Sequence, residues 1–155
     1  MRRKDRELSL EETKQVLAAG EYGILSTVCS DGKPYGVPVS YAYDHASGRI
    51  YIHGTSQESL RNTNMLAHPA VCFTVIGPTK VLPDKFSTLY SSAVVFGKAR
   101  KVEDKDEKVQ ALIKVVEKYS PDYMKEGLAY IDRALDAIAV FVIEDLSMTG
   151  KAKKK

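Results

Sequence analysis

The stretch IYIHGTSQESLRN, residues 50–62, predicts a short strand that ends at Gly54 and gives way to the first turn of a helix. A helix N-terminus presents unpaired backbone N–H groups and a partial positive charge, so it favours a phosphate or a carboxylate. Here Thr55, Ser56 and Ser59 add hydroxyl donors and Arg61 adds a cation, which together suit a phosphorylated ligand. The alternative is an ordinary helix cap, in which Thr55 or Ser56 satisfies the free amides.

The composition is that of an ordinary globular chain of one domain, residues 1–155, with basic ends at residues 1–6 and 151–155. The net charge of +3 is mild, and no basic aromatic patch indicates a nucleic-acid partner. Apolar runs such as residues 138–143 are strand-sized and too short to span a membrane. No signal peptide follows the basic start, so a cytoplasmic location is expected.

Six segments rich in strand-forming residues and separated by turns predict six β-strands. They cover residues 22–29, 35–43, 49–54, 71–76, 89–102 and 137–148. Four helical segments are predicted at residues 9–20, 59–67, 104–119 and 121–135. A loop is expected over residues 79–87. This order predicts an α+β protein, mainly β, built on a six-stranded antiparallel barrel with flanking helices.

Some single residues sharpen this prediction. Ser9 with Glu12, and Asp104 with Glu107, have the spacing of helix N-terminal caps. Pro38 lies inside a predicted strand, where it marks an edge, a bulge or a place where something other than a strand lies alongside. Gly97 indicates a bulge or a close backbone approach.

The histidines His45, His53 and His68 do not have metal-ligand spacing, so no metal site is expected. His53 is the one candidate for a catalytic role. It alternates with Tyr51 on one face of its strand, and beside the junction its near-neutral titration would suit proton donation. The alternative is a polar partner for Tyr51 on the less buried face of the strand.

Several segments match one known family in order and spacing over nearly the whole chain. They are RRKDRE (2–7), GVPVSY (36–41), IYIHG (50–54), PAVCF (69–73), VLPDKFST (81–88), VFG (95–97) and TGKA (149–152). With them the chain resembles the 5-nitroimidazole-resistance (Nim) family, which lies within the pyridoxamine 5′-phosphate oxidase-like FMN-binding split barrels.

The resemblance implies a homodimer of split barrels with FMN in clefts between the subunits. The phosphate would bind at Thr55, Ser59, Leu60 and Arg61. Val37, Pro38, Val39 and Ser40 would border the isoalloxazine ring, and backbone around His53 and Gly54 would reach its polar edge. The segment 86–91, with Thr88, Tyr90 and Ser91, would close the cleft from the partner subunit.

One departure from the family concerns the phosphate site. The family usually has Gly and Lys just inside the helix, in a pattern like E-G-x-K, whereas this chain has QESLR at residues 57–61. Arg61 supplies the charge of the missing lysine, with a different reach and a bidentate geometry.

The resemblance thus predicts an FMN-dependent oxidoreductase that takes electrons from NAD(P)H or another donor. A small acceptor, with nitroaromatics among the candidates, would receive them, and His53 would donate a proton. Two alternatives stay open: a barrel that binds flavin or haem without turnover, and an interaction module with an empty cleft. FAD in place of FMN is also open.

Overall fold

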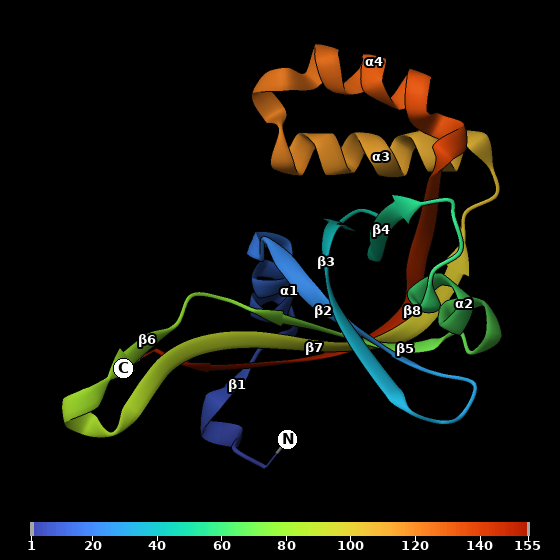
Figure 1. The fold of residues 1–155 in the computed structure, drawn as a ribbon. Helices are drawn as coiled ribbons and strands as arrows, with labels where there is room; N and C mark the ends of the chain where they lie inside the picture. Colours follow the sequence, from blue (N-terminus) through green and yellow to red (C-terminus); the bar gives the residue numbers. More distant parts are fainter. Residues whose placement is uncertain (1, 155) are drawn as a thin grey trace.

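The computed structural model describes residues 2–154 (Figure 1). The strands are β1 (Glu7–Leu8), β2 (Tyr22–Val28), β3 (Pro34–Asp44), β4 (Arg49–Thr55), β5 (Ala70–Ile76), β6 (Lys80–Leu82), β7 (Ser87–Lys101) and β8 (Ile138–Lys153). The α-helices are α1 (Leu10–Ala19), α2 (Leu60–Ala67), α3 (Lys105–Tyr119) and α4 (Met124–Ala134). Short 3₁₀ turns lie at Lys4–Arg6, Pro83–Lys85, Pro121–Tyr123 and Leu135–Ala137.

Six strands form a ring in which every neighbouring pair is antiparallel. The order runs β8-β4-β3-β2-β5-β7, and an extra pairing of β7 with β8 closes it. β1 joins the free side of β8, and β6 pairs with β7 outside the ring. The predicted six-stranded antiparallel barrel with flanking helices is therefore confirmed.

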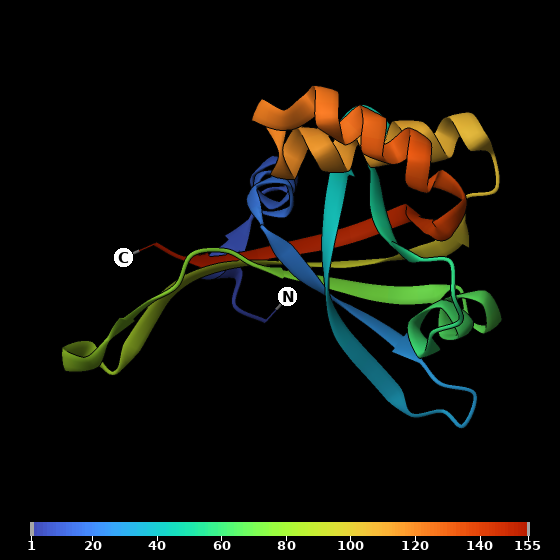
Figure 2. The ribbon, with the colours of Figure 1, turned by 45° about the horizontal axis from the view of Figure 1, so that its top comes forward.

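Two apolar clusters hold the fold together. The first fills the barrel and contains Leu25, Phe73 and Val95, none of which is exposed. The second lies outside the barrel, beneath the α3–α4 hairpin, and contains Tyr51 and Val140 of the strands and Leu112 of α3. Figure 2 shows these two helices side by side across the barrel. This helical layer leaves Tyr51 only 6% exposed. Its face of β4, which it shares with the half-buried His53, is still less buried than the face of Ile50 (0% exposed) and Ile52 (1%), as predicted.

The predicted helix caps are present. Ser9 forms a capping box with Glu12 at the start of α1, and the Asp104 side chain accepts from the Glu107 amide at the start of α3. The chain leaves α1 at Gly20, where a Cβ atom would collide with the Val75 side chain. Local sequence therefore determines where these helices begin and end.

Gly97 lies at an irregularity of β7, as predicted. The register between β7 and β8 shifts between Phe96 and Lys98. A Cβ atom at Gly97 would lie 2.8 Å from the carbonyl oxygen of Glu144, so only glycine allows this approach of the two backbones.

The two longest strands extend beyond the predicted ends. β7 begins at Ser87 rather than residue 89, and β8 continues to Lys153 rather than stopping at Met148. Lys151–Lys153, expected as part of a basic end, are strand residues that pair with Tyr90–Ser92 of β7. The predicted loop at residues 79–87 is an arm instead, because β6 and the first part of β7 form a hairpin that projects from the barrel (Figures 1 and 2).

The barrel is split between β3 and β4. These strands pair only from Tyr41 to Asp44 of β3, so residues 34–40 have β2 on one side and no described strand on the other. The Tyr41 amide donates to Tyr119 Oη at 3.0 Å, and Tyr119 in turn donates to the Glu21 carbonyl oxygen, on the β2 side. Because backbone direction alternates along a strand, the Pro38 nitrogen faces the open side. Pro38 therefore marks an edge, as predicted.

No helix within residues 2–154 is long and apolar enough to cross a membrane.

Candidate functional site

The predicted strand-to-helix junction is present, with a loop inserted between its two parts. β4 continues to Thr55 because this residue still pairs with Ile138 of β8, and α2 begins only at Leu60. Ser59 is the helix cap: its Oγ accepts from the Asn62 amide at 3.3 Å. The expectation that Thr55 or Ser56 caps the helix is wrong, since Thr55 Oγ1 accepts from the Gln57 amide within the loop, at 3.2 Å.

Arg61 is the central cation of the junction. Its guanidinium lies directly against the backbone of Gly54, in the space that a Cβ atom would occupy. Its Nε donates to Asn62 Oδ1 at 3.3 Å, and Asn62 Nδ2 donates to the Thr55 carbonyl oxygen at 3.4 Å. Between residues 2 and 154, no carboxylate lies within ion-pair distance of Arg61.

Arg61 is a cation with no anionic partner among residues 2–154, and its pKa reflects this. Burial lowers the pKa of the guanidinium, and the nearby Tyr35 phenol partly offsets this effect. A half-buried cation without a counter-charge loses hydration and gains no ion pair. An anionic ligand at this point would supply the missing interaction, with Ser59 and the first amides of α2 close by.

His53 lies next to Gly54 and is half-buried. Its Nδ1 is buried and has no hydrogen-bond partner among the described residues. Burial lowers the pKa of His53, and the positive charge of Arg61 lowers it further. The imidazole is therefore mainly neutral at pH 7, so near neutrality it acts as a hydrogen-bonding group rather than as a cationic acid.

The open edge of β3 lies across the split from this end of β4. Val37 and Val39 turn into the barrel, where Val39 is only 7% exposed, whereas Pro38 and Ser40 are exposed. The four predicted residues therefore share a strand edge rather than one face.

The remaining predicted residues divide into two groups. Leu60 is exposed on the first turn of α2, near Arg61 in the chain. Thr88, Tyr90 and Ser91 lie on the arm side of β7, while α2 lies at the other end of the barrel (Figure 1). Within one chain, these three residues do not join the Arg61 cluster.

Two contributors to the junction were not predicted. Asn62 links Arg61 to the end of β4, and the phenol of Tyr35 acts on the Arg61 charge from β3. The position of Asn62 three residues after Ser59 is a cap-linked position that a closer study of spacing could have identified. No local signal marks Tyr35, because its approach to Arg61 depends on the barrel.

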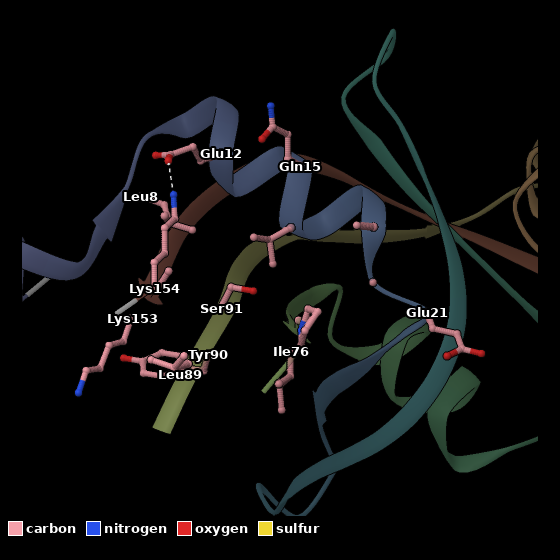
Figure 3. A pocket seen from close by; sticks show the side chains of 16 residues that line it. Leu8, Glu12, Gln15, Glu21, Ile76, Leu89, Tyr90, Ser91, Lys153 and Lys154 are labelled. Atoms are coloured by element: carbon pink, nitrogen blue, oxygen red, sulfur yellow. Dashed lines mark hydrogen bonds and ion pairs between the residues drawn. The ribbon is translucent and has the colours of Figure 1, made fainter. Parts of the chain in front are cut away.

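A large cavity lies away from this junction. It has a volume of about 770 Å³ and lies between α1, the end of β5 and the root of the arm (Figure 3). A second cavity of about 630 Å³ borders α2 and the loop at Ser56 to Glu58. Arg61 lines neither of these two cavities.

Comparison with known proteins identifies the fold family. The family model for pyridoxamine 5′-phosphate oxidase matches residues 9–152. A candidate 5-nitroimidazole antibiotic resistance protein from Bacteroides thetaiotaomicron is 23% identical and superimposes with a TM-score of 0.78, over 94% of this chain and 85% of that one. No curated protein matches the chain.

Two further solved structures carry cofactor names. An FAD-binding protein from Mesorhizobium loti is 24% identical, with a TM-score of 0.64 over 96% of this chain and 98% of that one. An FAD and haem binding protein from Mycobacterium smegmatis is 18% identical, with a TM-score of 0.77 over 97% of this chain and 74% of that one. At these identities the structures establish the fold alone, and the family match covers most of the sequence. The chain therefore belongs to the pyridoxamine 5′-phosphate oxidase-like family and has Nim-like structural neighbours.

Proposed function

We propose that this chain is a flavin-dependent oxidoreductase that binds FMN at the split of the barrel. The observation that carries the proposal is the half-buried guanidinium of Arg61, which has no carboxylate partner within residues 2–154 and lies at the start of α2. The FMN phosphate would accept hydrogen bonds from Arg61, from Ser59 and Thr55, and from backbone amides at Leu60.

The open edge of β3 supports the placement of the ring. Residues 34–40 lack a strand neighbour on the side of β4, and the Pro38 nitrogen there has no hydrogen to donate. A flat ligand that lies along this edge would not compete with a strand for hydrogen bonds. The isoalloxazine would lie beside Val37 to Ser40, with its polar edge towards the backbone of His53 and Gly54.

When bound, FMN supplies the electron-transfer chemistry, and the protein binds, orients and shields it from water. NAD(P)H or another donor would provide electrons, and a small acceptor, nitroaromatic compounds among them, would receive them. His53 would offer a neutral imidazole close to the acceptor. Replacement of His53 by Gln should lower turnover and leave FMN affinity unchanged; equal turnover with each acceptor tried would exclude this role.

The proposal includes a homodimer in which each cleft is completed by the partner. The outer faces of β2, β5 and β7 expose the large apolar side chains of Tyr22, Ile76 and Phe96. Phe86, at the tip of the arm between β6 and β7, is 99% exposed and has a left-handed backbone with φ of 46°. A second copy would cover these side chains, and its Thr88, Tyr90 and Ser91 would then reach the cleft. We place this dimer in the cytoplasm.

The absorption spectrum of the purified protein tests the proposal. Flavin bands that bleach on anaerobic addition of NADH or NADPH, and return with an acceptor, would support it. A Soret band would indicate haem instead, and flavin that no donor reduces would indicate a binding protein without turnover. Extraction of the flavin followed by chromatography separates FMN from FAD. Colourless protein that takes up neither cofactor in a titration would contradict the proposal.

A further inference from the structure

The cavity of about 770 Å³ has a long apolar wall and one charged end. Leu8, Val16 and Leu89 contribute aliphatic side chains, and Ile76 and Pro78 close one side. In Figure 3 the labelled side chains of this wall come from β1 (Leu8), from the end of β5 (Ile76) and from the root of the arm (Leu89). The volume of about 770 Å³ lies within the range of pockets that bind small organic ligands.

The charged end carries lysines that lack acidic partners. Lys151 Nζ lies 5.8 Å from the centre of the Tyr90 ring, and Lys153 donates to Ser87 Oγ. Neither lysine pairs with a carboxylate of residues 2–154, whereas the neighbouring Lys154 forms an ion pair with Glu12 at 2.9 Å. Lys153 lines the cavity, and Lys151 lies beside Tyr90, which also lines it, so two cations without counter-charges lie at or next to this end.

The pKa of the Tyr90 phenol indicates the electrostatic potential at this end of the cavity. Desolvation raises its pKa, but interactions with Arg6 and Lys151 outweigh this effect, so the pKa of Tyr90 lies below its ordinary value. The field therefore favours negative charge beside Tyr90.

The opposite end of the cavity differs in charge. Glu21 lines that end and forms no ion pair with any described residue. Figure 3 shows Glu21 on the other side of the cavity from Lys153. A ligand with one anionic group would consequently be oriented, with this group towards Lys151 and Lys153 and its apolar body along the wall.

We propose that this cavity binds a small organic acid, a carboxylate on an apolar or aromatic body, with the carboxylate beside Tyr90, Lys151 and Lys153. Aliphatic walls distinguish such a ligand from inorganic phosphate, which has no apolar surface to bury. The binding of this acid does not depend on the proposed function.

The test uses the full chain and two probes of equal shape, 4-nitrobenzoate and the neutral 4-nitrobenzamide, titrated by calorimetry at low salt. We expect the benzoate to bind at least 10-fold more tightly than the amide, because only the benzoate forms a charge-assisted contact with the lysines. The double variant Lys151→Gln/Lys153→Gln should abolish this preference. The matched control Lys80→Gln/Lys85→Gln removes two exposed charges of the arm and should retain it.

A further variant tests the location without changing charge. Ala19 is exposed on α1 and lines the cavity, so Ala19→Trp should place an indole ring in it and obstruct it while the core stays intact, and both probes should then bind more weakly. Equal affinity for the two probes, an equal loss in the control variant, or full binding by Ala19→Trp would overturn the proposal. FMN affinity is measured on the same samples. If FMN fails to bind while the benzoate preference persists, only the proposed function falls; if FMN binds and the preference is absent, only this inference falls.

Discussion

Arg49 and Arg100 differ from Arg61 in one respect: carboxylates lie within ion-pair distance of the first two, and none in the described chain lies so close to Arg61. Arg49 and Arg100 both lie between Glu107 and Glu144, and Arg100 contacts each of these residues at 3.0 Å. These ion pairs tie α3 to the ends of the barrel strands and raise the pKa of Arg100. Arg61 lies against Gly54 with no carboxylate in the described chain. The paired cations stabilise the scaffold, and the unpaired one is available for an anionic ligand.

Removal of Arg61 gives the largest expected effect. Arg61→Ala should weaken FMN binding by roughly 10–100-fold, because a hydrogen bond to a charged group contributes about 1.5–3 kcal/mol. Flavin fluorescence during titration measures the affinity. Thermal stability should be unchanged or slightly higher, since the variant removes a half-buried cation that has no partner. A loss of stability without a loss of affinity would place Arg61 with the scaffold arginines.

The same substitution in the scaffold group should have the opposite result. Arg100→Ala should lower the free energy of unfolding by about 1 kcal/mol, the size typical of partly exposed ion pairs. It should leave FMN affinity unchanged. Urea denaturation, with the same flavin titration as its control, separates the two effects. An altered FMN affinity would show that Arg61 and the scaffold arginines are not independent.

Gly54→Ala tests the contact that positions Arg61. The added Cβ would collide with the guanidinium, the flexible end of a long side chain, so the arginine should move with little effect on the melting temperature. FMN affinity should fall by several-fold, less than in Arg61→Ala, because the charge remains. An unchanged affinity would mean that the ligand does not depend on this position of Arg61.

Lys118 sharpens the comparison, because it is also unpaired but faces no open site. Its buried Nζ lies 3.6 Å from the centre of the Tyr41 ring, and burial lowers the pKa to about 8, from an ordinary value of 10.5. Between these values the unfolded chain binds more protons than the folded one, so this group makes stability rise with pH from about 8 to 10.5.

Lys118→Met should therefore reduce the increase in stability over this pH range and should not destabilise the protein at pH 7. Chemical denaturation of both proteins at pH 7, 8, 9 and 10 gives the difference between their free energies of unfolding. The titration of the other groups is common to both proteins and cancels in this difference. FMN affinity at pH 7 should not change. If both proteins show the same pH dependence, the Lys118 amine is not desolvated as described.

The sequence predicted the features that depend on neighbouring residues. The caps at Ser9 and Asp104, the edge at Pro38 and the bulge at Gly97 follow from local spacing and backbone requirements. The prediction missed what depends on distant strands. Lys151–Lys153 look like a solvated end, but their backbone pairs with β7.

The candidate site also contains features that the sequence predicted and features that it missed. A cation beside a helix start was visible at residues 59–61. The contact of Arg61 with Gly54, the orphaned Nδ1 of His53 and the approach of Tyr35 arise only when α2 packs against the closed barrel. The extent to which Tyr51 is buried likewise depends on helices that come more than fifty residues later.

A thermodynamic cycle with riboflavin tests most directly whether Arg61 binds the phosphate. Riboflavin has the ring system of FMN and lacks the phosphate. The wild-type protein should bind FMN more tightly than riboflavin, and Arg61→Ala should remove most of this difference while riboflavin affinity stays the same. An FMN preference that persists in Arg61→Ala, or an equal loss for both ligands, would contradict the assignment of the phosphate to the β4–α2 junction.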